Sequence, residues 1–209
     1  QLDTPIVSGN VSLYNQTNDA PINPTPVIGM VGSNSNINKI VSNKFQSEGD
    51  FIISIGENID PHKSPYFLQD QKIVEDINLY NELENINLED EKITAKILME
   101  ISDKNLLQSC NDISRGGIFM TLMKMIQKNY GFNIKASNDF ELFCEYKSGY
   151  VTTIKENNLK KVFALLDENK INYEEIGRVV IEEIKINSKN IDYFDIKDQY
   201  LNNFERIIN

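Results

Sequence analysis

Residues 111–117, NDISRGG, combine residue types that suit the binding of a phosphorylated ligand. The neighbouring residues predict a strand that ends at Asp112 and a helix that opens with Gly116 and Gly117. Glycines at such a junction let backbone N–H groups approach an anion, which the helix terminus also attracts. Ser114 lies next to these groups. A carboxylate beside the turn is well placed to hold Mg²⁺ on a nucleotide phosphate. The segment therefore predicts a nucleotide site with Asp112 as a metal ligand.

A purely structural role explains the same turn about equally well. Asp112 or Ser114 would then cap the helix, and the two glycines would permit tight packing. The segment is not a Walker A loop, because no Gly-Lys-Ser or Gly-Lys-Thr follows it. Both interpretations stay open on the sequence alone.

A second polar stretch, residues 5–17, reads PIVSGNVSLYNQT. It follows a short apolar lead-in and holds more hydrogen-bonding groups than a simple connection needs. The apolar runs at 4–8 and 25–32 predict short strands on either side of it. We therefore expect a strand–loop–strand unit, followed by a linker at 33–39.

His62 and the two cysteines offer little further chemistry. His62 is the single histidine of the sequence and lies beside a proline in an irregular stretch, which favours an exposed residue without a catalytic role. Cys110 and Cys144 are expected to pack as small apolar side chains. Two cysteines and one histidine do not supply a four-ligand zinc site or a disulfide framework. A reducing, cytoplasmic location is the expectation.

Composition limits the remaining function classes. The 209 residues, 40% of them hydrophobic, suit one medium domain, or one domain with a fragment of another. With 31 acidic against 21 basic residues and a net charge of −10, broad nucleic-acid binding is disfavoured. No apolar run is long enough for a transmembrane helix, and no secretion signal is recognisable, so no membrane association is expected. The start at Gln1, close to a predicted strand, suggests a fragment of a longer protein.

The elements that must position these residues alternate between helix and strand. This order predicts an α+β or α/β fold. Strands are expected at 49–57, 106–112, 132–135, 141–144, 150–154 and 171–180, the last with a hairpin partner at 183–186. Helices are expected near 66–70, from 90 onward, and at 115–129, 157–169 and 196–207.

Several segments together resemble one enzyme family. They are TPIVSGNVSLYNQT, PTPVIGMVG, GDFIISIGE, CNDISRGG, LFCEYKSGY and EEIGRV, in this order between Pro5 and Val179. The set is similar to the second half of the synthetase subunit of phosphoribosylformylglycinamidine synthase. That subunit belongs to the superfamily of aminoimidazole ribonucleotide synthetase and selenophosphate synthetase.

The resemblance implies a fold and a domain boundary. It implies an α+β class with a mixed sheet flanked by helices, of the aminoimidazole ribonucleotide synthetase C-terminal type. Residues 1–40 then form the trailing strand–loop–strand of a barrel-forming α/β domain, and residues 41–209 form the C-terminal domain.

The resemblance also implies a reaction. The family uses ATP and Mg²⁺ to activate the amide of formylglycinamide ribonucleotide. Ammonia, supplied by a separate glutaminase subunit, then gives the amidine. The rest of the same subunit completes the site, so the fragment alone is expected to be inactive.

Matching positions to the family motifs assigns roles to individual residues. Asp112 corresponds to a metal-nucleotide carboxylate. The phosphate or nucleotide contacts correspond to Ser8, Gly9, Asn10, Ser12, Ser64, Ser114, Gly116 and Gly117. No catalytic residue is assigned. Arg115 departs from the family, which usually has an acidic residue there, and the loop around Ser64 is shortened.

Two other functions remain compatible with the sequence. This half of a pseudo-symmetric subunit could hold a structural nucleotide or buttress the active half without catalysing a reaction. A free-standing binding module with no role in purine synthesis is the third possibility.

Overall fold

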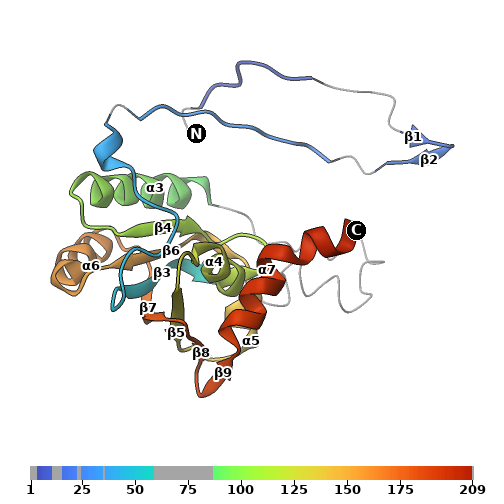
Figure 1. Ribbon diagram of the computed structural model, residues 1–209. Helices are drawn as coiled ribbons and strands as arrows, with labels where there is room; N and C mark the ends of the chain where they lie inside the picture. The colour runs from blue at the N-terminus through green and yellow to red at the C-terminus, as the bar shows by residue number, and fades with distance from the viewer. Residues whose placement is uncertain (1–3, 11–15, 23–24, 35, 59–86, 209) are drawn as a thin grey trace.

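A seven-stranded mixed sheet forms the centre of the computed structural model, which describes residues 4–10, 16–22, 25–34, 36–58 and 87–208 (Figure 1). All neighbouring strands are antiparallel except β5 and β8, which run parallel. The predicted α+β class with a mixed sheet is thereby confirmed. In spatial order the strands are β4 (Ser109–Asp112), β6 (Tyr146–Ile154), β3 (Phe51–Asn58), β7 (Tyr173–Ile181), β5 (Tyr130–Ile134), β8 (Ile184–Ile186) and β9 (Lys189–Ile191).

Helices cover both faces of this sheet. On one face lie α3 (Leu88–Asp103) and α6 (Leu159–Glu168), the latter preceded by the 3₁₀ turn Glu156–Asn158. The other face is covered by α4 (Gly117–Met125), α5 (Asp139–Phe143) and α7 (Tyr193–Ile208). Figure 1 shows the sheet between these two layers. Two hydrophobic clusters result, one on each side of the sheet.

Strand β3 contributes to both clusters because successive side chains of a strand point to opposite faces. Ile53 and Ile55 are fully buried on the side of α3 and α6. Ile52 is fully buried on the side of α4. A strand with apolar residues on both faces belongs in the middle of a covered sheet, and β3 lies between β6 and β7.

Helix α3 begins two residues before the predicted start at Asp90. The side chain of Asn87 accepts a hydrogen bond from the backbone N–H of Glu89 at 3.0 Å and so caps the helix. Acidic residues fill the first turn, where the helix dipole favours negative charge. The helical spacing of Ile97, Leu98 and Ile101 places them on one face of α3, and all three are buried.

The predicted strand at 141–144 is wrong, because most of this segment belongs to α5. The side chain of Asn138 accepts a hydrogen bond from the backbone N–H of Glu141 at 3.0 Å. The Glu141 carboxylate in turn accepts one from the backbone N–H of Ser137. This reciprocal pattern resembles a capping box and starts a helix.

The predicted hairpin between 171–180 and 183–186 is also wrong. Strand β8 pairs in parallel with β5, through Phe132 and Ile184, and not with β7. Its hairpin partner is β9, which the sequence did not predict. Ile184 is fully buried in the cluster under α4, which fixes β8 beside β5.

Residues 4–10, 16–22 and 25–34 run as an extended arm beyond the sheet (Figure 1). The predicted strands at 4–8 and 25–32 are not formed, because no described segment pairs with them. The arm has only the short hairpin β1 (Gln16–Thr17) and β2 (Ala20–Pro21), and the 3₁₀ turn η1 (Ile37–Lys39) follows it. Its apolar side chains are exposed, Val31 at 99%.

The predicted helix at 66–70 lies outside the described residues. Among the helices that the structure describes, none is both long and apolar enough to span a membrane.

Candidate functional site

The turn after β4 has the strand–turn–helix form that the sequence predicts. Strand β4 ends at Asp112, and the backbone N–H of Ile113 still donates to the Gly149 carbonyl of the neighbouring strand at 2.8 Å. Gly116 and Gly117 then open α4 with φ angles of +88° and +66°. Both angles lie in the left-handed region that glycine adopts readily. Successive backbone N–H groups in such turns form concave anion sites.

Packing accounts for one of the two glycines. A Cβ atom added to Gly117 would lie 2.5 Å from the Leu142 carbonyl oxygen and 2.7 Å from that of Cys144. The end of α5 therefore rests directly on the start of α4. The structural interpretation of the glycines is supported at Gly117, and it does not exclude anion binding by the N–H groups of the turn.

Side-chain capping of α4 is the part of the structural interpretation that is wrong. The N-cap position is Gly116, and no side chain caps it. Ser114 instead accepts a hydrogen bond from the Lys124 ammonium at 3.2 Å. Within the described residues, no hydrogen bond or ion pair engages the exposed carboxylate of Asp112. It is therefore available to a ligand.

Asp112 lies on the α3 side of the sheet. It pairs with Tyr150 across the β4–β6 ladder, and residues opposite each other in a ladder share a face. Burial raises the pKa of Tyr150, and the negative charges of Glu91 and Asp112 raise it further. Helix α4 packs on the opposite face. The Asp112 side chain and helix α4 therefore lie on opposite faces of the sheet, at its edge strand β4.

Cys110, two residues earlier on the same strand face, is an unreactive thiol. Burial, and secondarily the charge of Asp112, raises its pKa to about 12. It is therefore protonated at neutral pH and does not act as a nucleophile.

The remaining predicted residues do not join this turn within the described part of the chain. Ser8, Gly9 and Asn10 are exposed on the arm, and nothing lies within 4 Å of a Cβ built on Gly9. Ser12, Ser64 and His62 lie outside the described residues.

A Mg²⁺ ion could take Asp112 as one protein ligand. Among the described residues, no group of three or more His, Cys, Asp or Glu side chains could hold a metal ion by itself. Mg²⁺ commonly keeps several waters and binds through one or two carboxylates together with substrate phosphates. A single free carboxylate near a glycine turn is compatible with that mode.

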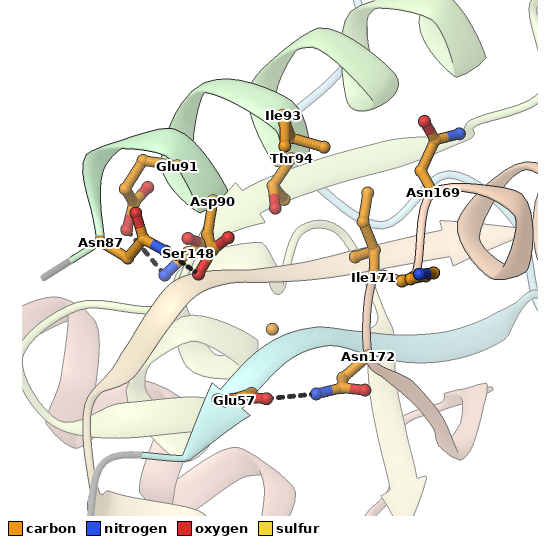
Figure 2. A pocket seen from close by; sticks show the side chains of 12 residues that line it. Glu57, Asn87, Asp90, Glu91, Ile93, Thr94, Ser148, Asn169, Ile171 and Asn172 are labelled. Carbon is orange, nitrogen blue, oxygen red and sulfur yellow. Dashed lines mark hydrogen bonds between the residues drawn. The ribbon is translucent and has the colours of Figure 1, made fainter. Parts of the chain in front are cut away.

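A polar cavity of about 150 Å³ was not predicted from the sequence. It lies between the first half of α3, the end of β3 and the connection from α6 to β7 (Figure 2). Four separate segments form its walls, so no local motif indicates it. Its lining comprises Gly56, Glu57, Asn87, Asp90, Glu91, Ile93, Thr94, Ser148, Asn169, Lys170, Ile171 and Asn172.

A family model matches most of the sheet and its helices. The model described as "AIR synthase related protein, C-terminal domain" matches residues 47–187.

Curated relatives match all or nearly all of the chain but are much longer than it. Phosphoribosylformylglycinamidine synthase subunit PurL of Sulfurovum sp. is 33% identical over all of this chain, which spans 28% of that protein. PurL of Petrotoga mobilis is 33% identical over 95% of this chain, which spans 27% of that protein. The chain thus spans under a third of either relative.

Solved structures share the fold at low sequence identity. Phosphoribosylformylglycinamidine synthase II of Thermotoga maritima matches with a TM-score of 0.61 and 12% identity, over 77% of this chain and 28% of that one. The same protein complexed with ATP matches with a TM-score of 0.57 and 10% identity, over 77% and 28%. The hydrogenase maturation protein HypE of E. coli matches with a TM-score of 0.53 and 15% identity, over 74% and 52%.

Proposed function

Because the chain belongs to the family of AIR synthase related proteins, C-terminal domain, we propose that it is the C-terminal part of an ATP-dependent ligase. The ligase converts formylglycinamide ribonucleotide and ammonia to formylglycinamidine ribonucleotide in purine biosynthesis. The names of the relatives, which are phosphoribosylformylglycinamidine synthase subunits, support this reaction. The activity belongs to the longer enzyme, since the chain spans 28% of the first of them.

The reaction has two steps. The amide oxygen attacks the γ-phosphorus of ATP, and the bond from that phosphorus to the leaving ADP oxygen breaks. Ammonia then attacks the amide carbon, and inorganic phosphate leaves with the activated oxygen to give the amidine. Both steps depend on positioning and on stabilising negative charge rather than on a protein nucleophile. The protonated thiol of Cys110 agrees with such chemistry.

The turn at 112–117 is the observation on which the proposal rests. The backbone N–H groups around Gly116 and Gly117 bind nucleotide phosphate, aided by Ser114, at the amino-terminal end of α4. Asp112 holds Mg²⁺ beside it. The ion offsets phosphate charge when it is bound.

The arm and the partners complete the proposal. Residues 1–40 belong to the preceding domain of the same subunit, and residues 41–209 form the C-terminal domain. Ser8, Gly9, Asn10 and Ser12 line the ligand cleft, and Ser64 contributes a phosphate contact. A glutaminase subunit supplies the ammonia, and the enzyme is cytoplasmic. The similar structures of T. maritima PurL complexed with FGAR and of PurLQS from Thermotoga maritima support the substrate and the partner.

A nucleotide-holding half without catalysis is the second candidate function. It is favoured by the single carboxylate at the turn, since the described residues include no group of three metal-ligating side chains. In that case Asp112 still supports nucleotide binding, but phosphate release does not depend on it.

Titration of the complete subunit with Mg·ATP tests whether Asp112 holds the metal ion. We expect Asp112→Asn to weaken Mg·ATP binding at least about tenfold, because it removes the metal-binding charge and keeps the side-chain shape. Asp103→Asn is the control, since Asp103 is exposed and pairs with Lys39 at the far end of α3. Equal affinities of wild type and Asp112→Asn would refute the metal role.

Activity separates the two candidate functions. In the complete subunit, Asp112→Asn should lower phosphate release that depends on formylglycinamide ribonucleotide. Weaker nucleotide binding with unchanged phosphate release would favour the nucleotide-holding half.

A further inference from the structure

One face of α4 is tied to the connection that follows β4. Gly117, Thr121 and Lys124 share this face, at the i, i+4 and i+7 positions of the helix. The Thr121 hydroxyl, in a residue only 1% exposed, lies 3.1 Å from the Asp112 carbonyl oxygen and 2.9 Å from that of Gly117. A long side chain farther along the same face can therefore reach the turn at 112–117.

Lys124 provides such a side chain. It lies in the last turn of α4, and helical side chains are inclined toward the amino-terminal end of their helix. Its ammonium group donates a hydrogen bond to the Ser114 hydroxyl, with 3.2 Å between Nζ and Oγ. Ser114 and Lys124 are both half-buried. A residue near the end of the helix thus places a positive charge at the turn where the helix begins.

The backbone around Lys124 is held by the segment before β3. The Lys44 ammonium donates a hydrogen bond to the Lys124 carbonyl. The backbone N–H of Phe45 donates to the Met125 carbonyl at 2.9 Å, and Phe45 is fully buried. These contacts fix the point from which the Lys124 side chain extends toward Ser114.

The contact with Lys124 decides which way the Ser114 hydroxyl can donate. An ammonium group has three donors and no acceptor, so the Ser114 oxygen must be the acceptor of this bond. The hydroxyl hydrogen of Ser114 is left for another acceptor. Within the described residues, no acceptor takes it and no carboxylate pairs with the Lys124 ammonium. The helix dipole is already positive at this end, so an added ammonium group favours an anion nearby.

We infer that Lys124 is a positioning residue of the proposed nucleotide site, where it orients the Ser114 hydroxyl as a hydrogen-bond donor to a nucleotide phosphate. This inference rests on the proposed function and adds to it the residue that prepares Ser114. The phosphate oxygen accepts from Ser114, and Ser114 accepts from Lys124, so the three groups form one chain of hydrogen bonds. The charge of Lys124 strengthens both bonds.

Calorimetric titration of the complete subunit with Mg·ATP tests this role. Lys124→Met removes the charge and its donors, and we expect it to weaken Mg·ATP binding about tenfold. Ser114→Ala should weaken binding by a similar factor. Because Lys124 acts through Ser114, the double variant should bind within about threefold of either single variant. Independent contributions would instead multiply to a loss of roughly a hundredfold.

Two further variants separate this role from a structural one. Lys124→Arg keeps a cation with several donors and should bind Mg·ATP within about threefold of wild type. Lys128→Met is the matched control, because Lys128 is exposed just after α4 and its carbonyl alone makes its described contacts. We expect less than a twofold change there. Thermal melting verifies each fold, and Lys124→Gln, which stays polar and loses the charge, replaces Lys124→Met if the latter unfolds.

The results that overturn this inference differ from those that overturn the proposed function. Unchanged Mg·ATP affinity in Lys124→Met, with weaker binding in Asp112→Asn, would keep the nucleotide site and remove Lys124 from it. Multiplied losses in the double variant, or no recovery in Lys124→Arg, would show that Lys124 does not orient Ser114. Equal losses in Lys124→Met and Lys128→Met would indicate general attraction between charges. Affinity that depends on none of Asp112, Ser114 and Lys124 would reject the nucleotide site itself.

Discussion

Gly117 joins the candidate phosphate-binding turn to the packing of the core. Its backbone lies against the carbonyl groups at the end of α5, where a side chain has no room. Its N–H also donates to the Ser114 carbonyl at 2.9 Å, which closes the turn. Gly117 therefore shapes the turn of the proposed nucleotide site through its packing, while its own N–H is already engaged by Ser114.

We expect Gly117→Ala to lower the free energy of unfolding by about 2 kcal/mol or more. The change combines a left-handed φ with a collision against backbone atoms that cannot move aside cheaply. Gly29→Ala is the control, because nothing lies within 4 Å of a Cβ there, and it should change stability by less than about 0.5 kcal/mol. Urea unfolding of both variants measures the difference. A similar loss in both would mean that Gly117 is not crowded.

Cys110 allows a pH-dependent prediction. With its pKa raised to about 12 by burial, its thiolate fraction at pH 8 is on the order of 10³-fold below that of an ordinary cysteine. We expect iodoacetamide to modify Cys110 correspondingly slowly, with a rate that rises about tenfold per pH unit from pH 7 to 9. Mass spectrometry of the Cys110 peptide follows the reaction, and the guanidinium-unfolded chain serves as control. A rate that levels off near pH 8.5 would contradict the raised pKa.

At the scale of elements, α5 depends on one local cap. The segment 138–141, NDFE, starts the helix through the side chain of Asn138 and the return hydrogen bond of Glu141. The helix then delivers the carbonyl groups of Leu142 and Cys144 to Gly117. A short surface helix thus fixes the geometry of the turn after β4.

Asn138→Ala should reduce the stability of the chain by about 1 kcal/mol, the typical cost of losing an N-cap. Ser137→Ala is the control, because Ser137 takes part through its backbone N–H, which the substitution keeps. Thermal unfolding compares the two. If Ser137→Ala costs as much as Asn138→Ala, the side-chain cap does not hold α5.

Element type was predictable from the sequence where a pattern is long, and less so where it is short. The stripe of Ile97, Leu98 and Ile101 and the apolar strand β3 follow from periodicity alone. At 141–144 a short, mostly apolar run of four residues favoured a strand. The capping pattern of Asn138 and Glu141 already indicated a helix there. Strand β8 was found, but its partner was not, since pairing with β5 is decided by burial of Ile184 in a distant cluster.

The candidate site, too, could be predicted from the sequence only in part. Spacing was sufficient to find Asp112, Gly116 and Gly117, because the strand, turn and helix are consecutive in the chain. It could not show that Asp112 faces the α3 side of the sheet beside Tyr150. The cavity with Thr94 and Ser148 was missed, because its walls come from segments far apart in sequence. The arm was predicted as strands because its composition is strand-like, but a strand also needs a partner.

For the molecule as a whole, the chain holds only part of the proposed ligase site. Its described residues supply one free carboxylate and one glycine turn, whereas activation of an amide needs positioning from several segments. We expect the chain alone to release no phosphate above background with ATP, Mg²⁺, ammonia and formylglycinamide ribonucleotide. A coupled phosphate assay measures this, with the complete subunit as positive control. Substrate-dependent release by the chain alone would contradict the proposed division of the site.

The arm also has a consequence for how the chain behaves at high concentration. Val27, Ile28 and Val31 are at least 90% exposed on a backbone without strand partners, and exposed strand-like segments pair readily between molecules. We expect Val31→Lys to reduce the concentration-dependent light scattering of the chain. Met99→Lys, which adds the same charge at an exposed residue of α3, should reduce it less. Equal effects would assign the association to net charge, whereas a specific effect of Val31→Lys would identify the arm as the part of the surface that limits colloidal stability.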